Sequence, residues 1–325
     1  MSNIPIVAEI GANHGGRLSV LIDTLHAAAR AGVDAVKIQT WGTMCVSDYT
    51  LESGPWAARG LADLYNEAKL PWEWHQDVAE VCEELGLAWW SSPFDAESVE
   101  FLETLGCPRY KIASFEIVDL ELIAVAAQTQ KPLIISTGMA SWDEINDAVA
   151  AAYHNGCVDL TLLKCTSAYP APASEVNLGA MQALRSAFDC KVGLSDHTLG
   201  THIAVAAVAL GADMVEKHFG ITGLDTAFSI DEAAMKVLVQ TCREARSAMG
   251  HAGFRPTPSE AEYRKLRRSL YIRGDLPAGH VLAAGDMVSA RPALGLSPAH
   301  LQQLIGRRLA SDTPAGTPTR WELFA

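Results

Sequence analysis

The chain has 325 residues, 49% of them hydrophobic and 19% charged, which is enough to bury a large core and a smaller second one. Its formal net charge of -13 is spread along the sequence, which disfavours a surface that binds nucleic-acid phosphates. Because no stretch approaches the roughly 20 apolar residues that cross a bilayer and the N-terminus lacks an export-signal pattern, we expect a cytoplasmic protein that binds no membrane.

Along the first 250 or so residues, short β-branched segments alternate with amphipathic helical patterns such as LSVLIDTLHAAARAG, which is typical of βα units and a parallel sheet. Eight such units in about 250 residues are typical of an α/β fold of the (β/α)8 TIM-barrel type. The expected strands are residues 5–11, 35–40, 87–92, 110–114, 132–137, 160–167, 191–196 and 214–219.

The connection after the second expected strand, residues 41–74, is much longer than usual. Connections of that length tend to be functional, so we expect this one to form a wall of the site.

After Gly250 the segment HAGFRPTPSE is rich in Pro, Gly and Ser, which predicts a linker. We therefore predict a barrel domain over residues 1–255, a linker over 256–265 and a small domain over 266–325. The small domain holds two strand-like segments, SLYIRG and MVSARPA, and one helical pattern, PAHLQQLIGRRLA. Its size makes it marginally stable on its own.

The reactive side chains of a TIM barrel lie where its strands end. Lysine is rare in buried strands unless it pairs or binds an anion, yet four lysines lie in or at the expected strands: Lys37, Lys111, Lys164 and Lys217. One interpretation is pairing with carboxylates such as Glu9 and Glu216, which we favour for Lys164 and Lys217. The other is anion binding, which we favour for Lys37 and Lys111.

Hydroxyl side chains also gather at the expected strand ends, and they are Ser92, Ser114, Ser136, Ser167 and Ser195. Lysines together with hydroxyl donors form a typical cradle for phosphate, so the sequence favours a phosphorylated substrate. There is no GxxxxGK[ST] motif, and the glycines of GANHGG are too loosely arranged to indicate a dinucleotide.

His197 and His218 close two successive strands, and each lies two residues after a polar residue of the same parity, Ser195 or Glu216. Both imidazoles should therefore point into the barrel mouth, where they could share a divalent metal. A hydrogen-bonded structural role for each histidine is the alternative. The seven cysteines form no CxxC pair, which favours reduced thiols over a zinc site.

A series of motifs resembles the sialic acid synthase family through nearly the whole chain: AEIGANHGG, VKIQT, SSPFD, YKIASFEI, IISTGMAS, LLKCTSAYPAP, VGLSDHTLG and EKHF. Within that family, LYNEAKLPWEWH, YKIASFEIVDLELI and LDTAFSI are most similar to the pseudaminic acid synthase branch. The end of the chain, with RRSLYIRGDLPAG, ARPALGL and GTPTRWEL, resembles the C-terminal antifreeze-like, or SAF, domain of the family.

The resemblance implies a transferase that uses Mn2+ or Mg2+ to condense phosphoenolpyruvate with an open-chain N-acetylated amino sugar and water. The products would be a nonulosonic acid and phosphate. In the pseudaminate branch the sugar is 2,4-diacetamido-2,4,6-trideoxy-L-altrose. Because the loop between EKHF and LDTAFSI is short and RPALGL replaces a glycine-richer RPGxGL, N-acetylneuraminate and legionaminate synthesis remain alternatives.

The resemblance also implies roles for individual residues. The ligands of phosphoenolpyruvate would be Lys37, Ser92, Lys111, Ser114, Ser136, Ser167 and Ser195, and those of the metal His197 and His218. The catalytic residues would be Glu116, Glu9, Asp225 and Tyr169, with Glu116 beside the reacting carbon. The sugar would contact Gln39, Asn13, Tyr169, Asp225 and Arg291, and Arg291 would reach the partner's site in a domain-swapped homodimer.

Two other classes of function remain open. Lys111 or Lys164 could be the Schiff-base nucleophile of a metal-independent pyruvate aldolase, since burial lowers the pKa of a strand lysine. The C-terminal domain would also suit a non-catalytic binding or ice-interacting protein, although a polar barrel mouth would then have no purpose.

Overall fold

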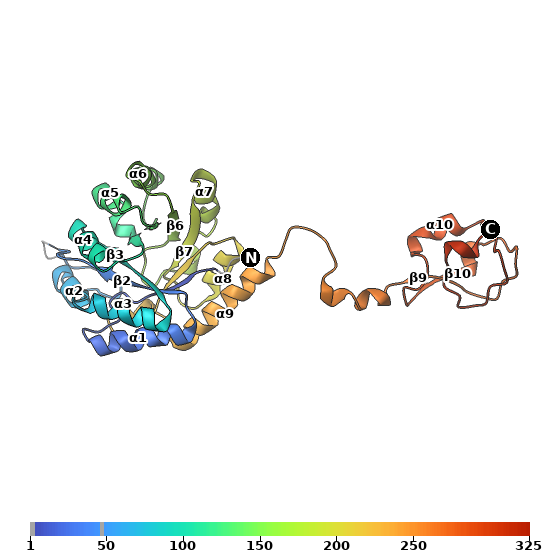
Figure 1. Ribbon diagram of the computed structural model, residues 1–325, viewed down its shortest axis with the longest axis horizontal. Coiled ribbons are helices and arrows are strands. Elements are labelled where there is room, and N and C mark those ends of the chain that lie inside the picture. The colour runs from blue at the N-terminus through green and yellow to red at the C-terminus, as the bar shows by residue number, and fades with distance from the viewer. Residues whose placement is uncertain (1–3, 46–48) are drawn as a thin grey trace. The chain divides into compact units, whose positions relative to one another are not determined.

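The computed structural model describes residues 4–45 and 49–325, which divide after Gly250 into two compact units (Figure 1). The first unit is a closed barrel of parallel strands in sequential order, so the predicted TIM barrel is confirmed. Strand β8 pairs with β1, which leaves the barrel without a free edge. The strands are β1 (Ile6–Glu9), β2 (Ala35–Thr40), β3 (Ala88–Pro93), β4 (Tyr110–Ile112), β5 (Leu133–Ser136), β6 (Leu160–Cys165), β7 (Lys191–Asp196) and β8 (Val215–His218).

Helices surround the strands of the first unit (Figure 1). They are α1 (Leu18–Ala31), α2 (Leu61–Ala68), α3 (Trp74–Leu85), α4 (Ala96–Thr104), α5 (Leu120–Gln128), α6 (Trp142–His154), α7 (Ala180–Ala187), α8 (His202–Ala209) and α9 (Glu232–Ala248). Helix α1 buries Leu21, Leu25 and Ala28, whose spacing places them on one face toward the strands. None of the described helices is long and apolar enough to cross a membrane.

The second unit is built around an antiparallel pair, β9 (Ser269–Ile272) and β10 (Met287–Ala290). Its buried apolar core is small and consists of Leu270, Ile272, Leu282, Met287 and Leu304.

The helix predicted from PAHLQQLIGRRLA is shorter than the pattern indicates, because only α10 (Leu301–Leu304) follows a 3-10 turn at Pro298–His300. The chain becomes extended at Ile305, and Gly306 has a φ of 84°, in the left-handed region that favours glycine. The amide of Gly306 then donates to the carbonyl of Leu282, so pairing with a neighbouring segment replaces further helix.

Candidate active site

All eight barrel strands are parallel, so their carboxyl ends meet at one end of the barrel, which we call the mouth. The side chains that gather there from the strand ends are polar and buried: Glu9, Lys37, Ser92, Lys111, Ser136, Ser195, Glu216 and His218. The sequence predicted this polar mouth, including the inward parity of His197 and His218.

Nine buried side-chain nitrogen or oxygen atoms in the described part of the chain lack a hydrogen-bond partner. Six of these atoms belong to residues at the mouth: Glu9, Asn13, Glu116, Ser136, Glu216 and His218. Glu9 Oε2 is nevertheless ion-paired with Lys37, which leaves five of the six without a hydrogen bond among the described residues. Buried polar atoms are nearly always hydrogen-bonded in folded proteins, so this concentration indicates a site whose partners are supplied by a ligand.

Two lysines and two glutamates form a buried ion cluster at the centre of the mouth. Lys37 Nζ lies 2.6 Å from Glu9 Oε2 and 3.7 Å from Glu216 Oε1, and Lys111 Nζ lies 3.5 Å from the same Glu216 oxygen. Burial raises the pKa of Glu216, but Lys111 and Lys37 together lower it below its usual value. Lys37 and Lys111 therefore do pair with carboxylates: Lys37 contacts Glu9 closely, and both lysines share Glu216.

The predicted serines lie around this ion cluster. Lys37 Nζ donates to Ser92 Oγ at 3.1 Å, and Ser195 Oγ donates to Glu216 Oε1 at 3.2 Å. A Cβ at Gly138 would overlap the hydroxyls of both Ser114 and Ser167, so these two hydroxyls lie beside this glycine. Ser136 Oγ is buried without a partner among the described residues. Five hydroxyls at or just after five strand ends thus lie at the mouth with the two lysines, an arrangement suited to an anion with several oxygens.

Glu116 lies in a 3-10 turn, Ser114–Glu116, that directly follows β4. Burial raises the pKa of its carboxyl group to about 7, and Glu116 Oε2 has no hydrogen-bond partner in residues 4–45 and 49–325. A carboxyl group with this pKa exchanges protons readily at neutral pH, which is the requirement for a general acid or base.

His197 and His218 lie at the ends of β7 and β8 with their ring centroids 5.2 Å apart. His197 Nδ1 is 2.9 Å from the carbonyl oxygen of Thr166; a carbonyl only accepts, so Nδ1 carries a proton and Nε2 is the nitrogen left for a metal. Burial lowers the pKa of His197, but the adjacent Cys165 outweighs burial and raises it, so this imidazole must lose a proton before it binds a metal. Burial lowers the pKa of His218 well below its usual value, so this imidazole is neutral. The two imidazoles suit a divalent metal, and no cluster of three or more His, Cys, Asp or Glu ligands occurs among the described residues.

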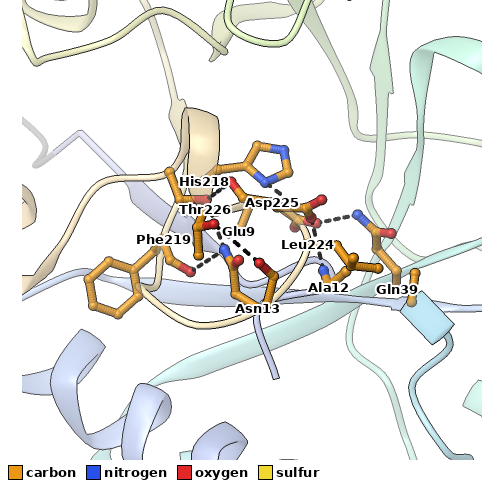
Figure 2. Close-up of polar contacts among 12 residues, drawn as sticks. Glu9, Ala12, Asn13, Gln39, His218, Phe219, Leu224, Asp225 and Thr226 are labelled. Atoms are coloured by element: carbon orange, nitrogen blue, oxygen red, sulfur yellow. Dashed lines mark hydrogen bonds and ion pairs between the residues drawn. The ribbon is translucent and has the colours of Figure 1, made fainter. Parts of the chain in front are cut away.

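Asp225 follows β8 and lies between the two loops that close this side of the mouth (Figure 2). Its Oδ2 accepts from the backbone amide of Ala12 at 2.9 Å and lies 3.7 Å from His218 Nδ1. Burial raises the pKa of Asp225 to about 6. In the same view, Gln39 Nε2 donates to Glu9 Oε1 at 2.6 Å. The predicted sugar ligands Gln39, Asn13 and Asp225 and the predicted catalytic residue Glu9 are therefore neighbours.

An aromatic cluster borders the two histidines. The Tyr169 ring lies 4.5 Å from that of His197 and 4.9 Å from that of Phe228, between centroids. Trp56, in the long connection between β2 and α2, lies 5.4 Å from Tyr169 and donates from Nε1 to the carbonyl of Leu224 at 3.2 Å. The sequence indicated a wall from this connection through its length, but no sequence signal identified Trp56 or Phe228 as the residues that form it.

Cys165 is a second residue that sequence analysis missed, because its apolar context favours a core thiol. Its Sγ lies 3.7 Å from His197 Nδ1 at the mouth. Burial raises the pKa of this thiol, but the adjacent His197 outweighs burial and brings it down to about 6.

The other two strand lysines do not reach the mouth. Lys217 Nζ is fully buried and lies 2.9 Å from Asp196 Oδ2, and it also donates to the carbonyl of Thr198. Lys164 Nζ donates to the carbonyl of Cys165 at 2.5 Å and to Thr166 Oγ1 at 3.3 Å. Parity turns both lysines to the outer face of the barrel. Lys217 follows the pairing interpretation, with Asp196, whereas Lys164 contacts a carbonyl and a hydroxyl in place of the predicted carboxylate.

Arg291, the last predicted sugar ligand, belongs to the second unit. It directly follows β10, and its side chain is exposed.

The chain is similar to known proteins over nearly its whole length. The model of the NeuB family matches residues 24–253, and that of the SAF domain matches residues 267–325. A pseudaminic acid synthase from Helicobacter pylori is 39% identical over 324 residues, with 96% of this chain and 95% of that protein covered. An N,N'-diacetyllegionaminic acid synthase from Legionella pneumophila is 37% identical over 332 residues, with 98% and 93% covered.

Among solved structures, an N-acetylneuraminic acid synthetase from Leptospira borgpetersenii in complex with citrate superposes with a TM-score of 0.71. It is 29% identical to this chain and covers 81% of it and 90% of its own length. The family match spans more than half of the chain, and the relatives match nearly all of it. The chain therefore belongs to the NeuB family and carries a SAF domain after its barrel.

Proposed function

We propose that the protein is a transferase that condenses phosphoenolpyruvate with 2,4-diacetamido-2,4,6-trideoxy-L-altrose and water, giving pseudaminic acid and phosphate. The observation that carries this proposal is the buried mouth in which Lys37 and Lys111 share Glu216 next to five polar atoms that lack a hydrogen-bond partner among the described residues. Such a mouth suits a small polyanion that must be held away from water.

Phosphoenolpyruvate would be bound by the lysines and the surrounding hydroxyls. Lys37 and Lys111 are buried and already oriented by Glu9 and Glu216, so little side-chain entropy is lost when the anion binds. The hydroxyl donors to its phosphate and carboxylate oxygens would be Ser92, Ser114, Ser136, Ser167 and Ser195. Fixed donors of this kind also stabilise the phosphate as it leaves.

The reaction forms one carbon–carbon bond and, from water, one carbon–oxygen bond, and it breaks the carbon–oxygen bond to phosphate. The methylene carbon of phosphoenolpyruvate attacks the aldehyde carbon of the sugar, the aldehyde oxygen takes a proton, and positive charge develops at the neighbouring carbon that bears the phosphate. Water adds to that carbon, and the bond to the phosphate oxygen then breaks. Glu116, with a pKa of about 7, would accept the proton of the water. Asp225 and Glu9, whose pKa values burial raises, are the candidate donors to the aldehyde oxygen, with Tyr169 beside them.

His197 and His218 would hold a divalent metal, Mn2+ or Mg2+, through imidazole nitrogens. When bound, the metal supplies a Lewis acid that polarises a carbonyl oxygen. The chain prepares these ligands: the carbonyl of Thr166 fixes the tautomer of His197, and burial keeps His218 neutral. His218 needs no proton removed before it binds a metal, whereas the raised pKa of His197 means that metal binding should weaken as pH falls.

The identity of the sugar is supported by the relatives and by the aromatic cluster. The relative from Helicobacter pylori is a pseudaminic acid synthase, whereas legionaminate synthesis is the second candidate, supported by the relative from Legionella pneumophila. Trp56, Tyr169 and Phe228 present apolar rings beside the histidines, which suits the methyl carbon of a 6-deoxy sugar. A sugar with a hydroxyl at that carbon would lose hydrogen bonds to water there, which disfavours N-acetylneuraminate synthesis.

We further propose that Arg291 acts on the sugar from the partner subunit of a domain-swapped homodimer. Arg291 is exposed, so its guanidinium is free to donate to a sugar. All seven cysteines are free, which supports a location in the reducing cytoplasm.

Phosphate release tests the proposed function. The protein is stripped with EDTA and assayed with phosphoenolpyruvate and a panel of diacetamido and monoacetamido hexoses, with and without Mn2+. We expect release with the 6-deoxy diacetamido sugar only after metal is restored, and no metal stimulation in His218→Ala. Borohydride trapping of a pyruvate adduct with EDTA-insensitive turnover would establish the aldolase instead. A folded protein that releases no phosphate with any sugar would favour the non-catalytic alternative.

A further inference from the structure

We propose that Asn13 is a positioning residue whose side chain fixes the loop between β8 and α9, so that Asp225 is held beside His218. This inference rests on the proposed function, because it assigns Asp225 a task at the sugar. It differs from the expectation that Asn13 itself contacts the sugar.

A chain of hydrogen bonds leads from the Asn13 side chain to the backbone of Asp225 (Figure 2). Asn13 Nδ2 donates to the carbonyl oxygen of Phe219 at 3.1 Å and to Ser229 Oγ at 2.8 Å. Ser229 Oγ in turn donates to the carbonyl oxygen of Asp225 at 2.6 Å. One amide group thus holds both ends of the loop, residues 219–229, and is linked to the backbone of Asp225 through a single hydroxyl.

The Asp225 side chain forms a second link between the loop after β1 and the loop after β8. Asp225 Oδ2 accepts from the amide of Ala12, the residue before Asn13, at 2.9 Å. The loop after β1 therefore holds the Asp225 backbone through Asn13 and the Asp225 carboxylate through Ala12. These reciprocal bonds leave the carboxylate with one location, 3.7 Å from His218 Nδ1.

Glycines allow the close approach that these bonds need. Gly220 and Gly223 have φ values of 128° and 117°, in a region that L residues rarely adopt. A Cβ at Gly220 would overlap the Asn13 side chain, and one at Gly223 would overlap the carbonyl of Ala12. The backbones of the two loops are therefore in close contact, which favours a fixed loop over a mobile one.

Asn13 also has little left to offer a ligand directly. Its side chain is fully buried, and both hydrogens of Nδ2 are used by Phe219 and Ser229. Only Oδ1 lacks a partner among the described residues. If this oxygen accepted from the sugar, Asn13 would act on its own and not through Asp225, and a double-mutant cycle separates the two cases.

The first experiment needs no substrate. Amide hydrogen exchange is measured on the full chain for wild type and for Asn13→Ala, Ser229→Ala and Ser229→Thr. We expect exchange of residues 219–229 to become about tenfold faster in Asn13→Ala and Ser229→Ala and to return toward wild type in Ser229→Thr, which keeps the hydroxyl. Exchange of the loop of residues 166–176 should stay unchanged in these variants. The control Thr24→Ala, which loses a partly buried hydrogen bond in α1, should leave exchange of residues 219–229 unchanged. Unchanged exchange of residues 219–229 in both alanine variants would overturn the proposal.

The second experiment is a cycle of Asn13→Ala with Asp225→Ala, read as kcat/KM for the sugar and for phosphoenolpyruvate. Asn13→Ala alone should lower kcat/KM for the sugar by about 10- to 100-fold, with KM for phosphoenolpyruvate within about twofold of wild type. In the Asp225→Ala background, the same change should cost less than about threefold. Two losses that multiply would mean that Asn13 binds the sugar independently, and the proposal would be wrong. If wild type turns over no sugar, the proposed function fails. The hydrogen-exchange experiment still tests whether Asn13 fixes the loop of residues 219–229.

Discussion

Glu216 and Lys217 are neighbours in β8, yet their side chains enter two different environments. Glu216 points into the mouth, where it is shared by Lys37 and Lys111 and keeps one oxygen unpartnered. Lys217 points to the outer layer between strands and helices, where Asp196 and the carbonyl of Thr198 satisfy it. Both groups are buried and charged, but only the outer pair is complete within the chain.

The difference separates structural charges from functional ones. A buried charge destabilises a fold unless it is paired and hydrogen-bonded, and the outer layer meets that requirement. The mouth does not, since it holds most of the buried atoms without hydrogen-bond partners in the described residues. An incomplete set of buried charges is tolerated where a ligand completes it, so burial combined with incompleteness marks the site better than charge alone.

The largest expected effect distinguishes two strand lysines by their functions. Lys111→Met should lower kcat/KM for phosphoenolpyruvate by about 10³-fold, because it removes a fixed cation from the developing phosphate. Lys164→Met should change it by less than about threefold, since Lys164 Nζ donates to the carbonyl of Cys165 and to Thr166 Oγ1 on the outer face of the barrel. Steady-state phosphate release measures both variants, and comparable losses in the two would refute the distinction between mouth and outer layer.

For the stability of the fold, we expect the outer lysine to matter more than the lysine at the mouth. Lys217→Met should destabilise the fold by about 3–5 kcal/mol, because it leaves the fully buried Asp196 carboxylate without its cation. Lys111→Met should cost much less, since Lys37 still lies near Glu216. Urea unfolding measures both values. The double variant Asp196→Leu, Lys217→Met is the control: it should recover most of the loss, and failure to do so would point to packing instead of charge.

The pH dependence of kcat tests the role of the Glu116 carboxylate at the mouth. The pKa of Glu116 is raised to about 7, so the carboxylate that accepts a proton disappears as pH falls below 7, and kcat should fall with it. Glu116→Gln should remove this acidic limb and lower kcat by about 10²-fold. A raised pKa also means that folding favours the neutral form, so stability should fall as pH rises through 7, but not in Glu116→Gln.

Glu144 offers a matched control, because it is exposed and its pKa is lowered by Ser141 at the start of α6. Glu144→Gln should keep the acidic limb of kcat. A limb that survives in Glu116→Gln would assign the titration to another group.

The smallest expected effect concerns the second unit. Arg291→Ala should raise KM for the sugar by about tenfold through loss of one charged hydrogen bond, and leave KM for phosphoenolpyruvate unchanged. Mixing Arg291→Ala with Lys111→Met chains should restore part of the activity if the arginine acts across subunits. No restoration on mixing would place Arg291 in its own subunit's site, and an unchanged KM would remove it from the sugar site.

Sequence analysis recovered the barrel and most of the mouth, because period-2 strands alternating with helices fix which residues end each strand and which side chains share a parity. That reasoning brought Lys37, Lys111, His197 and His218 to one place. It could not find Trp56, which lies in a long connection where no periodicity operates, nor the short α10, where pairing of Gly306 with Leu282 outweighs a helical pattern.

What the sequence determined by itself is the order of the strands and the chemical types at their ends, since both follow from local pattern and from the family motifs. Only the tertiary structure decided which of those groups remain incomplete. The alternation of β8 already turns Glu216 inward and Lys217 outward, but only the folded barrel gives Lys217 its partner Asp196 and leaves one oxygen of Glu216 without a hydrogen bond among the described residues. Likewise Asn13 and Ser229 meet only because β8 pairs with β1, which brings residues far apart in the chain within a hydrogen bond.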